Sequence, residues 1–155
     1  MQDIEVRGIK DEEIGAAVAL IKTGFESFIA TGYSPEGVNE FLRFIQPEAM
    51  QLRLEAGNIM LVAYRKDRLI GVIEVRDGNH IALLFTAEEF HRHGIANRLL
   101  EKIINICRGK NGKIAEITVN SSPFAGKIYE KMGFVHKDSE QVNNGIRFIP
   151  MVKRI

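Results

Sequence analysis

The residue types around positions 83–100 suit the binding of a phosphate group. An apolar run is followed by a turn with basic side chains and by a helical pattern that begins near Gly94. The start of a helix presents unpaired backbone N–H groups and the positive end of the helix dipole, which together favour anions. Gly94 lets a ligand approach the backbone closely, and Arg92, His93 and Arg98 add positive charge. Taken alone, such a turn is more often part of a solvated basic surface. Whether it binds a phosphate must therefore be judged from the residues around it.

A second segment, at 120–134, combines a polar turn residue, a helix and a tyrosine. Asn120 ends an apolar strand pattern, Ser122-Pro123 is typical of a helix start, and Tyr129 follows inside that helix. Gly133-Phe134 ends the helix and begins the next strand. On its own, Asn120 is an ordinary turn residue and Tyr129 an ordinary half-buried tyrosine.

Together the two segments resemble the signature of the GCN5-related N-acetyltransferases, the GNAT family. The run His91-Arg92-His93-Gly94-Ile95-Ala96 is similar to the family's (Gln/Arg)-x-x-Gly-x-(Gly/Ala) motif, with His91 in place of the usual Gln or Arg. The order of Asn120, Tyr129 and Gly133-Phe134 looks like the family's second segment, at the right distance from the first. The specific resemblance covers residues 80–135, and the rest of the chain follows the family only in the order of its elements.

The resemblance implies that acetyl-CoA is the cosubstrate and that the motif holds its pyrophosphate. In the family, the strand before the motif pairs with the pantetheine arm, the Asn lies near that arm, and the Tyr points at the thioester sulfur. The ligand would thus extend the sheet along 84–86, with a backbone N–H near Thr86 facing the thioester oxygen. The implied cofactor-binding residues are Leu84, Phe85, Thr86, His91, Arg92, His93, Gly94, Ile95, Ala96, Asn97, Asn120 and Tyr129.

Acyl transfer from a thioester needs a free amine, a stabilised oxyanion and a protonated leaving thiolate. Tyr129 suits the role of general acid, because a phenol with a pKa of ~10 holds a proton that can reach a thiolate whose thiol has a pKa of ~8.5. An alkylammonium has a pKa of ~10.4, so a base would help to free the amine. Glu74 and His80 are candidate bases on neighbouring strands, although each also suits a strand-end or solvent-facing position, and water is the third candidate.

The acceptor pocket is expected between residues 25 and 44, with Phe28 and Tyr33 as candidate substrate-binding residues. Four of the nine phenylalanines lie in this range, and most of them suit the core. The connection 31–34 is free to form a lid over the thioester end. The expected acceptor is a primary amine of a small molecule or a peptide, which the sequence does not identify further.

The elements that must position these residues alternate between helical and strand patterns along the whole chain. Strands are expected at 4–7, 59–64, 69–75, 81–86, 114–119, 134–136 and 147–153, and helices begin near Asp11, Ser34, Pro47, Gly94 and Ser122. Turn sequences at 65–67 and 77–79 make the middle strands an antiparallel meander. We therefore expect one domain over residues 1–155, an α/β fold with a mixed, mostly antiparallel sheet flanked by helices. The GNAT resemblance implies the same fold.

Composition supports one ordinary globular domain without a membrane or nucleic-acid role. The 155 residues are 45% apolar and carry a formal net charge of +1, so no broad basic surface for nucleic acid is expected. No apolar run approaches the length of a membrane span, and the N-terminus lacks the pattern of a signal peptide. One cysteine, Cys107, cannot form an internal disulfide, which favours a cytoplasmic location.

Other functions are weaker interpretations of the same sequence. The four histidines, which include His91 and His93, do not show the spacing of a metal site, so no metal is expected. A CoA-binding sensor or interaction module without turnover is the main alternative, and the presence of Asn120 and Tyr129 argues against it. The sequence is compatible with a homodimer as well as with a monomer.

Overall fold

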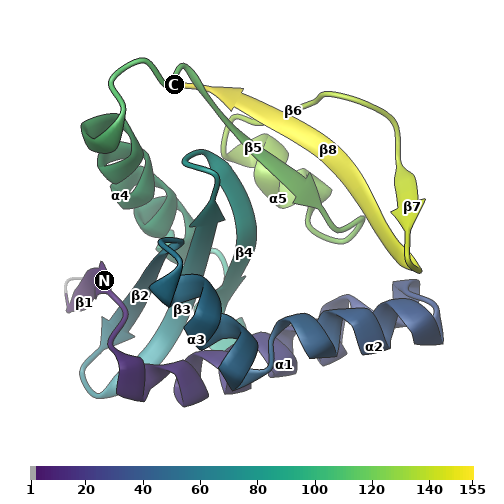
Figure 1. Cartoon of the computed structure of the whole chain (residues 1–155), viewed down its shortest axis with the longest axis horizontal. Coiled ribbons are helices and arrows are strands. Elements are labelled where there is room, and N and C mark those ends of the chain that lie inside the picture. The colour runs from purple at the N-terminus through teal and green to yellow at the C-terminus, as the bar shows by residue number, and fades with distance from the viewer. Residues whose placement is uncertain (1–2) are drawn as a thin grey trace.

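The computed structural model describes residues 3–155, which form an eight-stranded sheet with helices on both faces (Figure 1). The strands are β1 (Ile4–Gly8), β2 (Ile59–Arg65), β3 (Arg68–Arg76), β4 (His80–Thr86), β5 (Glu116–Ser121), β6 (Val135–His136), β7 (Gln141–Asn143) and β8 (Ile146–Arg154). The helices are α1 (Ile14–Phe28), α2 (Pro35–Phe44), α3 (Pro47–Glu55), α4 (Ile95–Lys110) and α5 (Gly126–Lys131). Within residues 3–155, no helix combines the length and apolar character needed to cross a bilayer.

The sheet has the strand order β1-β2-β3-β4-β5-β8-β6, with β7 paired to β8. All strand pairs are antiparallel except β4 and β5, which are parallel. These two strands pair only at His80 with Thr118 and at Ile81 with Val119. Beyond that point β4 and β5 diverge, which leaves one edge of β4 unpaired toward its end at Thr86 (Figure 1).

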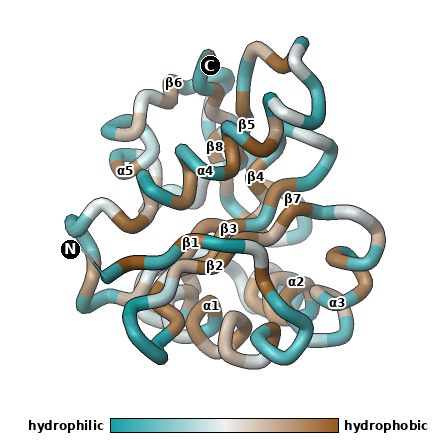
Figure 2. Tube along the Cα trace, turned by 90° about the vertical axis from the view of Figure 1, so that its left-hand side faces the viewer, coloured by the Kyte–Doolittle hydropathy of each residue, from teal (hydrophilic) through white to brown (hydrophobic). Residues whose placement is uncertain are grey.

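The core consists of two apolar layers, one on each face of the sheet. On β2, Met60 and Val62 belong to the layer under α1 and α3, whereas Leu61 and Ala63 belong to the layer under α4. Successive strand residues point to opposite faces, so a strand buried on both sides is apolar throughout. Figure 2 shows apolar residues gathered along β2 and β3, the strands that are covered on both faces.

The structure confirms the expected fold class and most of the expected elements, with differences around α5 and β8. The helix expected from Ser122 begins only at Gly126, because the Ser122 hydroxyl and carbonyl oxygens both accept from the Ala125 N–H and close a separate turn. A short strand, β7, also precedes β8 and pairs with it. The helix after Gly94 agrees closely with α4.

A buried ion pair joins α3 to the sheet. Glu74 on β3 is fully buried, and its carboxylate accepts hydrogen bonds from the Arg53 guanidinium at 2.7 and 3.1 Å and from the Asn58 amide at 2.8 Å. The same guanidinium donates to the Phe44 carbonyl at 2.7 Å and lies 3.8 Å from the Phe44 ring centroid. Arg53 therefore connects the end of α2, α3 and the centre of the sheet.

Removing Arg53 should destabilise the fold by a large amount. Breaking one partner of a buried ion pair leaves an uncompensated charge and costs about 3–5 kcal/mol. We expect Arg53→Met to lower the free energy of unfolding in urea by that amount. The double variant Arg53→Met/Glu74→Gln removes the buried charge and should regain much of the loss. Equal urea midpoints for wild type and Arg53→Met would contradict this role of the pair.

Candidate active site

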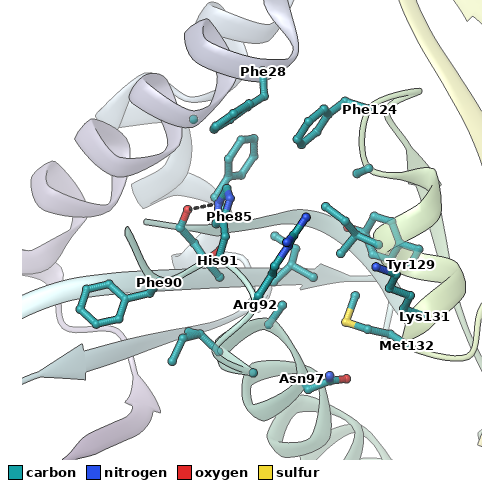
Figure 3. A pocket seen from close by; sticks show the side chains of 18 of the residues that line it. Phe28, Phe85, Phe90, His91, Arg92, Asn97, Phe124, Tyr129, Lys131 and Met132 are labelled. Carbon is teal, nitrogen blue, oxygen red and sulfur yellow. Dashed lines mark hydrogen bonds between the residues drawn. The ribbon is translucent and has the colours of Figure 1, made fainter. Parts of the chain in front are cut away.

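The divergence of β4 and β5 opens a cavity of about 400 Å³. It is lined by the end of α1, the end of β4, the turn before α4, the start of α4 and the helix α5 with its preceding turn (Figure 3). Eleven of the residues named from the sequence line it: Phe28, Leu84, Phe85, Thr86, His91, Arg92, Gly94, Ile95, Ala96, Asn97 and Tyr129. Segments far apart in the chain thus meet in one space.

One end of the cavity is the turn that leads into α4. Arg92 and Gly94 both have positive φ, at 67° and 78°, which directs the chain sharply into the helix. The first bond of the helix runs from the Arg98 N–H to the Gly94 carbonyl, so the N–H groups before Arg98 have no acceptor within α4. Gly94 has no side chain to cap them, and a Cβ added there would meet no atom within 4 Å. The turn therefore offers several unpaired N–H groups to an anion.

A glycine on the sheet allows α4 to begin close to this turn. A Cβ on Gly71 of β3 would lie 3.0 Å from the side chains of Ile95 and Leu99. The first turn of α4 therefore rests directly on β3 at Gly71, which pairs with Thr86 at the end of β4. This close approach places the start of the helix next to the unpaired edge of β4.

The free edge of β4 presents backbone groups to the cavity. The Ala87 N–H donates to the Ile70 carbonyl of β3 at 2.8 Å. Peptide groups of successive strand residues point to opposite edges, so those of Leu84 and Thr86 point away from β3, toward the gap. The Thr86 carbonyl lies 3.2 Å from the His91 Nε2, which therefore carries a hydrogen in that bond (Figure 3). The Thr86 N–H and both Leu84 groups stay open to a ligand.

Tyr129 lies in the wall opposite β4. Its side chain is buried, packs edge-on against Phe134 with ring centroids 5.3 Å apart, and lines the cavity. Burial raises the pKa of the Tyr129 hydroxyl well above its ordinary value, so it is protonated at neutral pH. The site thus holds a fixed hydrogen-bond donor whose proton is not lost to solvent.

The other end of the cavity is aromatic. Phe28 at the end of α1 and Phe124 before α5 stack with centroids 5.0 Å apart and an interplanar angle of 20°. The His91 ring lies 5.5 Å from that of Phe28, and Phe85 lies below the pair (Figure 3). Gly24 makes room for the Phe85 ring, since a Cβ there would lie 2.9 Å from it.

Sequence reasoning missed several of these lining residues. Phe124 had a signal, because it directly follows Pro123 in a segment already singled out, but a phenylalanine there also suits the core. Gly24 sits inside a helical pattern, where nothing in the sequence indicates that it faces a cavity. Ile29, Phe90, Ala125, Ile128, Lys131 and Met132 also line the cavity and were not named as site residues.

Six candidate site residues named from the sequence do not line the cavity. Arg98 donates to the Ile4 carbonyl at 3.1 Å. Glu74 is held by Arg53 and Asn58 as described above. His80 bonds Thr118 Oγ1 through Nδ1 at 2.8 Å, and burial lowers the pKa of His80 to about 4. Asn120 is exposed opposite Pro150 on β8, His93 is exposed, and the half-buried Tyr33 packs edge-on against Phe25 at 5.5 Å.

The chemistry available in the cavity is polar at one end and apolar at the other. The polar end offers helix N–H groups, strand N–H and C=O groups and a phenol, all of which suit an anionic, amide-containing ligand. Within residues 3–155, no group of three His, Cys, Asp or Glu side chains is arranged to hold a metal ion.

Comparison with known proteins identifies relatives of this architecture. Comparison with curated proteins yields no match. Among solved structures, a GCN5-related N-acetyltransferase from Rhodopseudomonas palustris has a TM-score of 0.84 at 21% identity, covering 100% of this chain and 98% of that one. The PaiA N-acetyltransferase from Thermoplasma acidophilum, solved with coenzyme A, has a TM-score of 0.79 at 20% identity, covering 98% and 99%.

A larger enzyme contains the same fold as a part. N-acetylglutamate synthase from Neisseria gonorrhoeae, solved with coenzyme A and N-acetyl-glutamate, has a TM-score of 0.72 at 18% identity, covering 97% of this chain and 35% of that one. These likenesses establish the fold. The family model of the acetyltransferase (GNAT) domain matches residues 29–155, which include β4, the turn before α4 and Tyr129. The chain therefore belongs to the GNAT acetyltransferase family.

Proposed function

We propose that the protein transfers the acetyl group of acetyl-CoA to a primary amine of a small molecule or peptide. The observation that carries this proposal is one continuous cavity that joins an uncapped helix start, an open strand edge and a buried tyrosine. In the reaction, the amine nitrogen bonds to the thioester carbonyl carbon, the C–S bond breaks, the amine loses a proton and the CoA sulfur gains one. Each part of the cavity suits one part of this reaction.

The CoA pyrophosphate fits the turn before α4. The N–H groups of Ile95, Ala96 and Asn97 converge there, and Arg92 adds a positive charge at the cavity. Each charge at a helix terminus is worth about 0.3–1 kcal/mol, so binding depends on several donors acting together. Leu84 and Thr86 would bind the pantetheine arm through their peptide groups, so their side chains are not needed for this contact.

His91 stands at the position where the family motif has Gln or Arg, and it contacts the end of β4. By donating to the Thr86 carbonyl, its imidazole satisfies one acceptor on the open edge of β4. The neighbouring Thr86 N–H remains free to face the thioester oxygen, where a donor stabilises the developing oxyanion. His91 is therefore a positioning residue in this proposal, and its ring also closes the space toward Phe28.

Tyr129 is the donor that faces the leaving sulfur. Because burial raises the pKa of Tyr129, complete transfer of its proton to an ordinary thiolate is unfavourable. The cost is about 1.36 kcal/mol for each unit by which the pKa of the phenol exceeds that of the thiol. The same apolar surroundings also disfavour a bare thiolate and raise the proton affinity of the sulfur. The hydroxyl thus stabilises the sulfur by a hydrogen bond first and transfers its proton as the C–S bond breaks.

The acceptor amine loses its proton to water in this proposal. Glu74 is committed to a buried ion pair, and His80 bonds Thr118 at the paired end of β4 and β5. Neither side chain lines the cavity. An amine that enters as the free base, or that passes its proton to water at the mouth, needs neither residue.

A negative charge placed at the turn before α4 should weaken CoA binding. Gly94→Asp puts a carboxylate where the pyrophosphate would lie, and Asp is among the residues that best tolerate positive φ. We expect CoA to bind at least about tenfold more weakly, which equals 1.4 kcal/mol. Calorimetric titration and the CoA-induced rise in melting temperature measure the loss.

The chain offers a matched control for this variant. Gly78 has a φ of 80°, close to the 78° of Gly94, and lies in the β3–β4 turn outside the cavity. Gly78→Asp adds the same charge and similar backbone strain, so it should bind CoA as the wild type does. Equal CoA affinity in the two variants would rule out the proposed phosphate site.

Removing the Tyr129 hydroxyl should slow the chemical step. Tyr129→Phe keeps the ring against Phe134 but removes the donor, and general acid assistance is worth about 10²–10⁴-fold. We expect kcat to fall by at least about tenfold in a chemistry-limited assay of thiol release, with CoA affinity and melting temperature nearly unchanged. Tyr64→Phe, on β2 outside the cavity, is the control that keeps full activity. Full activity in Tyr129→Phe would assign the donor to water.

A further inference from the structure

The two ends of the cavity differ in chemistry, and the apolar end is not needed for CoA. The proposed CoA contacts lie at the start of α4, along β4 and at Tyr129. At the other end the lining side chains are hydrocarbon, namely those of Phe28, Ile29, Phe124 and Ile128, with the Phe85 ring beside them and Gly24 adding no side chain. In Figure 3, Phe28 and Phe124 face each other at the opposite end from Asn97, which marks the start of α4.

No carboxylate is available to an ammonium group in this cavity. None of the described residues that line it is Asp or Glu. Apart from His91, its ionisable cationic side chains are Arg92 and Lys131, which are both positive. The carboxylate of Glu74 is buried on Arg53, and that of Glu89 pairs with Arg68. A substrate with several positive charges would be repelled by the basic residues and would find no counter-ion.

The apolar end is open to solvent, as is the end at the start of α4. Phe124 is 46% exposed and Ile128 is 42% exposed, although both are large apolar side chains that line the cavity. A second substrate must enter from solvent while CoA occupies the other end. Exposed aromatic surface at the mouth is suited to the substrate that enters there, because it is buried only when that substrate binds.

We infer that the acceptor is a monoamine whose carbon skeleton carries an aromatic or branched apolar group, and that this group binds against Phe28 and Phe124. The inference rests on the proposed function and adds the substrate class. The amine nitrogen then points inward, toward β4 and Tyr129, while the apolar group covers the stacked rings. Diamines, polyamines and acidic amino acids are poor acceptors, since each would place an unpaired charge on the apolar wall.

The first test measures binding of acetylated products, so that it does not depend on turnover. Calorimetry compares N-acetylphenethylamine with N-acetylputrescine, both with and without saturating CoA. We expect the aromatic product to bind at least about tenfold more tightly, because only it buries an apolar ring. Equal or tighter binding of N-acetylputrescine, in either condition, overturns the inference. Failure of CoA itself to bind would instead contradict the proposed function.

The second test changes the mouth of the cavity. Phe124→Asp places a carboxylate at an exposed position, where folding tolerates it, and should reduce or reverse the preference for the aromatic product. Leu52→Asp is the control, because Leu52 is 66% exposed on α3 and does not line the cavity. An unchanged preference in Phe124→Asp overturns the inference.

A longer acyl chain is the other apolar group that this wall could bind. The third test therefore titrates the wild type and Phe124→Asp with acetyl-CoA and with hexanoyl-CoA in the calorimeter. We expect similar affinities for the two thioesters in the wild type. Hexanoyl-CoA binding at least about tenfold more tightly than acetyl-CoA, with the difference lost in Phe124→Asp, would assign the wall to the acyl donor and overturn the inference.

Discussion

The pairing of β4 with β5 over only two residues is the constraint on which the site depends. A strand edge inside a protein normally has its peptide groups paired, because an unpaired buried N–H or C=O costs about 1–3 kcal/mol. Here the strands separate and the resulting edge faces a cavity of about 400 Å³. One exposed acceptor, the Thr86 carbonyl, is satisfied by His91, and the others are left for a ligand that can pair with a strand.

The rest of the architecture holds this gap open. The buried layers on both faces of the sheet hold β4 against β3. On the other side, β8 pairs with all six residues of β5, the strand that leads into the turn and helix α5 opposite β4. Gly71 lets the start of α4 pack closely on β3, so the turn before α4 lies beside the unpaired edge of β4. The Arg53–Glu74 pair anchors α3 to the same sheet from the other face.

Backbone features could be predicted from the sequence, whereas side-chain partners could not. The apolar runs between residues 59 and 86, the turn sequences that separate them and the Gly94 turn reflect local rules, and they predicted their elements well. Glu74 and His80 were plausible bases because they lie on central strands, but the register that pairs Glu74 with Arg53 and His80 with Thr118 depends on contacts distant in sequence. Phe124 was not named for the same reason, since its stacking partner is on α1.

The two ends of the cavity are built from different parts of the chain. At the start of α4 and along β4 the donors and acceptors belong to the main chain, so substitution of most side chains there leaves them in place. At the mouth, the surface is formed by side chains such as Phe28 and Phe124, which single substitutions can replace. Substitutions at the mouth can therefore reshape the apolar surface while the main-chain donors and acceptors at the other end stay in place.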